Sequence, residues 1–104
     1  MIKNKIITYI SFAKKAGLLY VGFDSVKSSI LSNKAKLVIL LKDISEKTQK
    51  EIIHISNIYD CKYVFINLTS ENFKHIFHKK VVVISIDDKN LSSAILNQIK
   101  DDND

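Results

Sequence analysis

The chain has 104 residues, of which 46% are hydrophobic and 26% charged, so it is long enough to form one self-supporting domain. No apolar run approaches the roughly 20 residues of a membrane span, and the N-terminus lacks the apolar core and cleavage site of a signal peptide. The single cysteine, Cys61, cannot form an internal disulfide, which favours a cytoplasmic location.

The charge is unevenly distributed along the chain. Its net value is +5 and every basic residue is a lysine; residues 1–50 carry ten lysines against three acidic residues, whereas residues 51–104 carry six against eight. A basic half favours a polyanionic partner such as nucleic acid, although ordinary solvated lysines would give the same composition. Without arginine, the chain has no guanidinium fork for paired hydrogen bonds to phosphate or guanine.

The first half predicts two helices, each followed by a strand. The first helix has apolar residues at spacings of three and four, and Gly17 should end it. Its apolar positions are Ile2, Ile6, Tyr9, Ile10, Ala13 and Ala16. A short strand is expected over residues 18–21, a second helix over residues 22–31 and a buried strand over residues 36–41.

The second half continues the alternation. Ser45 can cap a helix over residues 46–59, and Asp88 can cap the last helix. Strands are expected over residues 63–66 and 81–86, with a short helix over residues 70–77 between them. The pattern predicts the α/β class, a three-layer α/β/α sandwich around a four-stranded mixed sheet. Residues 1–100 would form this single domain, and residues 101–104 a disordered acidic tail.

The sequence contains no clear pattern of catalytic or metal-binding residues. His75 and His78 are three residues apart, but no further ligands at zinc-binding spacing accompany them or His54. Cys61, at the entrance to a strand, fits a small core residue better than a nucleophile. Asp87 and Asp88 are adjacent, and a helix cap explains at least one of them. The sequence therefore predicts no enzyme, no cofactor and no metal.

The second helix carries an unusual face. With 3.6 residues per turn, Phe23, Val26 and Ile30 fall on one side. The opposite side holds Asp24, Ser25, Ser28, Ser29 and Ser32, with Lys27 at the border. This face is either simply solvated, or a shallow surface near a helix N-terminus whose free N–H groups attract phosphate. Gly22 would let the chain turn there without a Cβ.

Four blocks in register resemble one family. They read AKKAGLL at residues 13–19, VG at 21–22, NKAKLV at 33–38 and DISEKT at 43–48. With the elements in this order, the chain resembles the kink-turn RNA-binding ribosomal-protein superfamily, which includes the large-subunit proteins L-seven-Ae and L-thirty-e. Within it, the bacterial YlxQ-like proteins are the most similar type. The resemblance implies an α/β/α sandwich and a non-catalytic, ribosome-associated RNA-binding protein.

The resemblance also implies a site. Family members bind RNA through a Gly-x-Asn-Glu-x-x-Lys motif, which here becomes Gly22, Asp24, Ser25 and Ser28, so that only the glycine is retained. A second RNA-contacting loop corresponds to residues 77–80. The predicted RNA-binding residues are Gly22, Asp24, Ser25, Lys27, Ser28, Lys34, Lys36, Lys79 and Lys80. With the motif changed, kink-turn specificity stays open, and affinity should rest on phosphate contacts.

Two functions are therefore carried forward. The first is a monomer that binds structured RNA, either ribosomal or other. The second is a protein-interaction module on the same fold, with the altered helix face meeting a protein partner, because the polar residues that read RNA in the family have changed.

Overall fold

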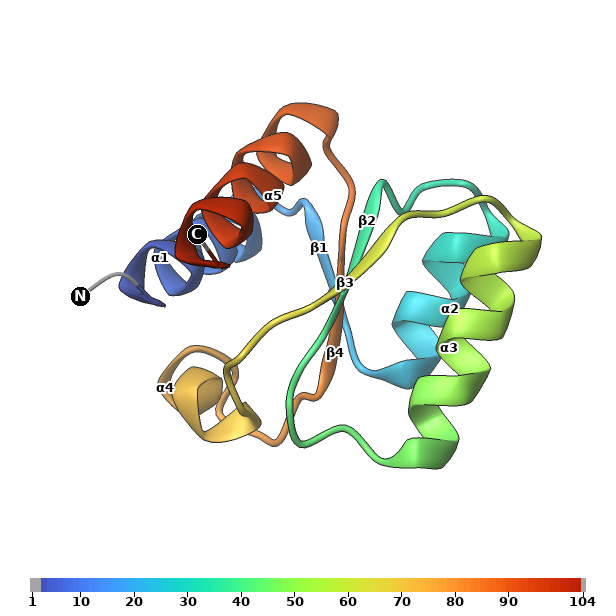
Figure 1. Cartoon of the computed structure of the whole chain (residues 1–104), viewed down its shortest axis with the longest axis horizontal. Coiled ribbons are helices and arrows are strands. Elements are labelled where there is room, and N and C mark those ends of the chain that lie inside the picture. Colours follow the sequence, from blue (N-terminus) through green and yellow to red (C-terminus); the bar gives the residue numbers. More distant parts are fainter. Residues whose placement is uncertain (1–2, 104) are drawn as a thin grey trace.

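A four-stranded sheet lies between two layers of helices in the computed structural model, which describes residues 3–103 (Figure 1). In chain order the elements are α1 (Lys3–Lys15), β1 (Leu19–Val21), α2 (Phe23–Leu31), β2 (Leu37–Leu40), α3 (Glu46–Ile58), β3 (Tyr63–Phe65), the 3₁₀ helix η1 (Ser70–Phe73), α4 (Lys74–Phe77), β4 (Val83–Ile86) and α5 (Lys89–Asn103). The strand order is β1-β4-β2-β3. β4 is antiparallel to both of its neighbours and β2 is parallel to β3. The predicted three-layer sandwich with a mixed sheet is confirmed.

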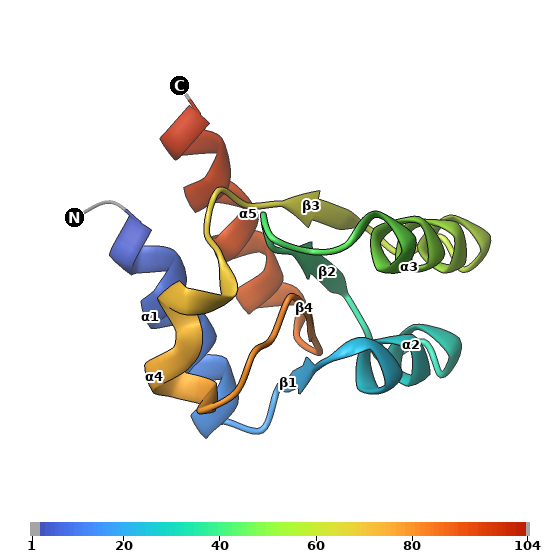
Figure 2. The same cartoon turned by 90° about the horizontal axis from the view of Figure 1, so that it is seen from below.

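Each face of the sheet supports its own core. α1, α4 and α5 cover one face, and α2 and α3 cover the other (Figures 1 and 2). Along β2 the side chains alternate between the two: Leu37 and Ile39 join the first core, Val38 and Leu40 the second. All four are fully buried. The continuous apolar run therefore reflects a strand covered on both faces, as the sequence predicted.

The helices α1, α2 and α3 end in the same way. In α1, the Gly17 N–H donates to Lys14 O at 3.2 Å and the Leu18 N–H to Ala13 O at 2.9 Å, the pair of bonds that defines a Schellman turn. Gly17 has φ +72°, and Asn33 and Asp60 take the left-handed position after α2 and α3. The predicted role of Gly17 is confirmed. Ala16, expected on the apolar stripe of α1, is exposed, and Ile2 lies outside the described residues.

Gly22 starts α2 in a conformation that other residues avoid. Its φ of 88° and ψ of 161° fall in a region populated essentially by glycine. Its N–H donates to Val83 O, and its C=O accepts from the Val26 N–H, both at 3.0 Å. A Cβ added there would meet no atom within 4 Å. The backbone angles, and not a lack of space, therefore require glycine.

Several element boundaries differ from those expected. β4 begins at Val83, although Val82 O still accepts from the Leu41 N–H at 2.9 Å. The predicted helix over residues 70–77 is divided into η1 and α4. Asp88 caps α5 as predicted, accepting from the Leu91 N–H at 2.7 Å. α5 continues through Asn103 into the predicted disordered tail, because extending an existing helix adds a hydrogen bond without a new nucleus.

The two glycines should respond differently to asparagine, which tolerates the left-handed helical region but not the angles of Gly22. We expect Gly17→Asn to lower the free energy of unfolding by about 1 kcal/mol at most. Gly22→Asn should lower it by about 1–3 kcal/mol. Urea unfolding followed by circular dichroism would measure both. Equal losses would contradict the conformational argument, since neither site is sterically crowded.

Candidate nucleic-acid interface

One edge of the sheet gathers segments from distant parts of the chain. The carboxyl ends of β1, β2 and β3 and the amino end of β4 meet there, because β4 runs against its neighbours. Backbone hydrogen bonds connect them: Gly22 N–H to Val83 O at 3.0 Å, Leu41 N–H to Val82 O and Lys42 N–H to Leu68 O, both at 2.9 Å. The start of α2 and the segment before β4 are thus neighbours on this edge, which we call the α2 edge.

The start of α2 offers an exposed polar surface. Asp24, Ser25, Lys27 and Ser28 are all exposed, as predicted. Gly22 has no side chain with which to cap the helix, so the first-turn N–H groups receive no side-chain cap. Asp24, in the first turn, is favourably placed in the helix dipole. Small hydroxyl side chains beside uncapped N–H groups leave room for close approach by a ligand backbone.

Ser29 was predicted on this exposed face and is buried instead, with 2% of its surface exposed. Its hydroxyl donates to Val26 O at 2.7 Å and lies 2.7 Å from the hydroxyl of Ser85 on β4. Ser32 is exposed, as predicted, and its hydroxyl donates to Ser28 O at 2.9 Å. The buried arc of α2 is wider than its apolar residues suggested, because a serine on β4 provides a polar partner inside the core.

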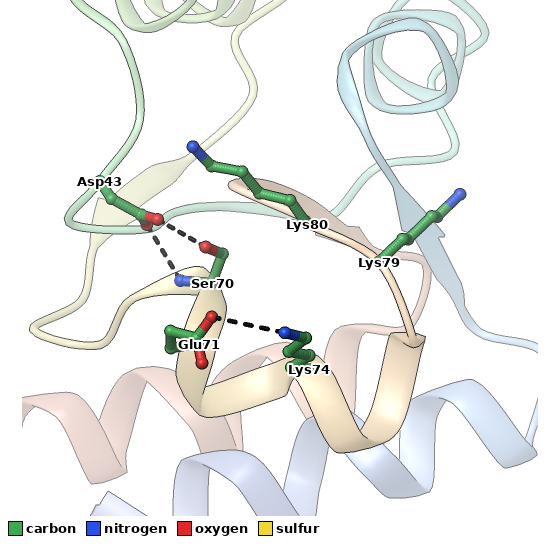
Figure 3. A pocket seen from close by; sticks show the side chains of 6 residues that line it. All are labelled: Asp43, Ser70, Glu71, Lys74, Lys79 and Lys80. Carbon is green, nitrogen blue, oxygen red and sulfur yellow. Dashed lines mark hydrogen bonds and ion pairs between the residues drawn. The ribbon is translucent and has the colours of Figure 1, made fainter.

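Lys79 and Lys80 border a shallow hollow on the same edge (Figure 3). The hollow has a volume of about 430 Å³ and is lined by Asp43, Ser70, Glu71, Lys74, Lys79 and Lys80. Lys74 lies 3.9 Å from Glu71, whereas neither Lys79 nor Lys80 has an ion-pair partner among residues 5–101. Figure 3 shows Lys79 extending toward the blue ribbon of β1, and hence toward the α2 side of the edge.

Asp43 fastens the loop after β2 to the start of η1. Its carboxylate accepts from the Ser70 N–H at 3.0 Å and from the Ser70 hydroxyl at 2.6 Å. Desolvation by itself raises the pKa of this carboxyl. The hydrogen bonds from Ser70 and from its own N–H, together with the charge of Lys80, outweigh desolvation, so the pKa lies below the usual 3.8. Asp43 therefore stays ionised and shapes the hollow.

Lys34 and Lys36 lie at the opposite edge of the sheet. The Lys36 N–H donates to Ile86 O at 2.8 Å, at the carboxyl end of β4, and its Nζ donates to Asn33 O at 3.2 Å. About 13 Å of helix separates them from Gly22, at 1.5 Å per residue. The structure thus brings together seven of the nine predicted residues and leaves these two apart. Lys36 instead offsets the negative C-terminal end of α2.

Sequence reasoning missed several residues of this edge, among them Lys42, Asp43, Ser70 and Lys74. A signal for Lys42 and Asp43 was present, because both come just after a buried strand, and Gly22 likewise follows a strand. Carboxyl ends of parallel strands share one edge of a sheet, so residues there are close in space. Ser70 and Lys74 carried no such signal, since the path of η1 and α4 depends on packing.

The residues weighed for catalysis do not converge. His54 is on α3, which covers one face of the sheet. His75 is in α4 and His78 directly follows it, on the opposite face. Among the side chains of residues 5–101, no three His, Cys, Asp or Glu could hold one metal ion. Burial raises the pKa of the half-buried Cys61 thiol, which disfavours the nucleophilic thiolate. None of the described helices combines the length and apolarity that crossing a membrane requires.

The Ser29–Ser85 pair yields an asymmetric prediction. A hydroxyl has one hydrogen, so Ser29 can donate to Val26 O while accepting from Ser85. Ser29→Ala would leave the buried Ser85 hydroxyl without its hydrogen-bond partner and lower the free energy of unfolding by about 1–3 kcal/mol. Ser85→Ala leaves the Val26 bond and should cost about 0.5–1.5 kcal/mol. Urea unfolding of both variants and the double variant tests this; strictly additive losses would contradict it.

Asp43 should make stability depend on pH in the acid range. Because folding lowers its pKa, the ionised carboxylate stabilises the fold above the unfolded value of about 3.8, and this contribution disappears as the pH falls through the folded pKa. Asp43→Asn should therefore lower the melting temperature at pH 7 and differ less from wild type near pH 3. Ser70→Ala, which keeps the backbone bond, is the milder control. A deficit that is unchanged by pH would rule out the linkage.

Comparison with known proteins agrees with this fold. The model of the Ribosomal protein L7Ae/L30e/S12e/Gadd45 family matches residues 4–96. A solved structure of a protein with unknown function from Bacillus halodurans C superposes with a TM-score of 0.83 at 22% identity, covering 92% of this chain and 97% of that one. At that identity it shows the fold alone. No curated protein matches the chain. Because the family model spans most of its length, the chain belongs to the Ribosomal protein L7Ae/L30e/S12e/Gadd45 family.

Proposed function

We propose that this chain is a non-catalytic, cytoplasmic protein that binds structured RNA as a monomer through the α2 edge, in association with the ribosome. Family membership supports the RNA partner. The observation that carries the site is the bond between Gly22 N–H and Val83 O, which places the uncapped start of α2 beside the segment that bears Lys79 and Lys80.

Each group on this edge would make a different kind of contact with RNA. Uncapped N–H groups of α2 and the ammonium groups of Lys27, Lys79 and Lys80 attract phosphate. Ser25 and Ser28 can donate or accept a hydrogen bond and are short enough to admit an RNA backbone. Asp24 offers acceptors only, so it suits an amino or hydroxyl group of RNA and repels a phosphate. The lysines act as point charges, without the paired geometry of arginine.

In more detail, we propose that the chain is a YlxQ-like protein, and that its specificity for kink-turn RNA depends on the changed motif at the start of α2. Of the family's Gly-x-Asn-Glu-x-x-Lys motif, the chain retains Gly22, while Asp24, Ser25 and Ser28 replace the residues that read RNA. An interface that depends on lysines and backbone N–H groups recognises the position of phosphates more than base identity. We therefore expect shape-dependent binding that weakens steeply with salt.

An electrophoretic mobility shift with a kink-turn RNA and an unbent duplex, each at two salt concentrations, tests the proposal. Binding should occur at low salt and weaken at high salt. Changing both Lys79 and Lys80 to alanine should weaken binding to either RNA and reduce the slope of log affinity against log salt by roughly 2. The matched control changes Lys34 and Lys36 to alanine, which removes the same charge at the opposite edge of the sheet.

The outcomes separate the components of the proposal. Absence of binding to both RNAs at low salt would refute RNA binding. Equal binding to both would keep RNA binding and remove kink-turn specificity. If the Lys34 and Lys36 variant lost as much affinity and salt dependence as the Lys79 and Lys80 variant, the site would not be the α2 edge.

The second candidate is a protein-interaction module that uses the same edge, favoured by the replacement of three of the four motif residues. Copurification from cells with and without ribonuclease treatment distinguishes the two. A partner that persists after treatment, and that Ser28→Glu on the exposed face of α2 releases, would favour the protein partner. A partner lost on treatment would favour RNA.

A further inference from the structure

Lys14 is an exposed residue whose ammonium group contacts a distant segment of the chain. It lies in the last turn of α1, and its Nζ donates to Ile76 O, 62 residues away, at 2.5 Å. The same Nζ lies 5.9 Å from the centroid of the Phe77 ring, within the range of a cation–π contact. Lys14 therefore joins α1 to the end of α4.

The end of α4 has a chemical need for such a partner. The last carbonyl groups of a helix lack intrahelical donors and carry partial negative charge, which a cation offsets. α4 has only four residues, and His78 ends it in the left-handed conformation at φ 58°, its N–H donating to Lys74 O at 2.8 Å. This bond leaves Ile76 O to the ammonium of Lys14. A helix this short depends on contacts outside itself for stability.

The segment from η1 to α4 is consequently held at both ends by charged side chains. Asp43 fastens its start through Ser70, and Lys14 fastens its end through Ile76 and Phe77. Between these contacts, Phe73 is fully buried and lies 6.2 Å from the Phe77 ring. The next residues are His78, Lys79 and Lys80, so this lysine pair directly follows the residues that Lys14 contacts.

We propose that Lys14 is a positioning residue of the interface: it holds the turn that presents Lys79 and Lys80, and it does not itself contact RNA. The inference rests on the proposed function. A lysine in the basic half of the sequence would ordinarily be taken for supporting charge near the RNA. Its hydrogen bond to a helix carbonyl instead commits the ammonium to the protein.

Lys15 provides a matched control. It is the next residue of α1 and is exposed like Lys14, but its side chain makes no hydrogen bond, ion pair or ring contact with residues 5–101. Lys14→Met and Lys15→Met remove the same charge from neighbouring positions while keeping an unbranched side chain. Lys14→Arg keeps a cationic donor, so it should restore the contact with Ile76 O in part.

The first measurement needs no RNA. Amide hydrogen exchange of the intact protein, resolved by residue, should show faster exchange at His78 in Lys14→Met than in wild type or Lys15→Met, with Lys14→Arg in between. The global melting temperature controls for general destabilisation. Unchanged exchange at His78 in Lys14→Met would overturn the proposal.

The second measurement is a double-mutant cycle in the mobility-shift assay. With Lys79 and Lys80 intact, Lys14→Met should weaken RNA binding roughly 3- to 10-fold more than Lys15→Met, within the range for residues coupled through one network. When both Lys79 and Lys80 are alanine, the two methionine variants should behave alike. Additive losses would instead make Lys14 a direct phosphate contact and overturn its positioning role. If wild type bound no RNA, the proposed function would fail with it, whereas additivity alone refutes only this inference.

Discussion

The antiparallel pairing of β4 with both β1 and β2 is the constraint on which the rest of the structure depends. Ile84 sits opposite Val21 on one side and Ile39 on the other, so the last strand to appear in the sequence becomes an inner strand of the sheet. Its reversed direction brings its amino end to the edge where β1 and β2 finish. The bond from Gly22 N–H to Val83 O follows, and with it the proximity of the α2 start to the lysine pair before β4.

A single polar contact inside the second core sets which part of α2 reaches solvent. Ser29 and Ser85 pair through their hydroxyls while the neighbouring core residues are aliphatic. The pair turns Ser29 inward, so Ser25 and Ser28 remain as the exposed hydroxyl groups near Gly22. Similar side chains on one helix therefore have different roles: one orients the helix on the sheet, and the others form a surface that a phosphate backbone can approach.

The lysines also differ in role, because some ammonium groups are engaged by the protein and others are not. At the ends of helices, Lys14 and Lys36 donate to backbone carbonyl groups, where a cation offsets the helix dipole. Lys74 is paired with Glu71 at 3.9 Å, and Lys79 and Lys80 have no ion-pair partner in the described part of the chain. A net charge of +5 describes the whole protein, but the charge available to a polyanion depends on which ammonium groups the fold has already engaged.

The sequence by itself determined the class of fold, the cap residues Ser45 and Asp88 and the stop at Gly17, because periodicity, capping and left-handed turns are local properties. It also marked Gly22, whose backbone angles only glycine readily adopts. Only the tertiary structure decided that Ser29 is buried, that Lys34 and Lys36 lie away from the α2 edge, and that Lys14 binds α4. Each of these depends on contacts between residues far apart in sequence, which no local pattern encodes.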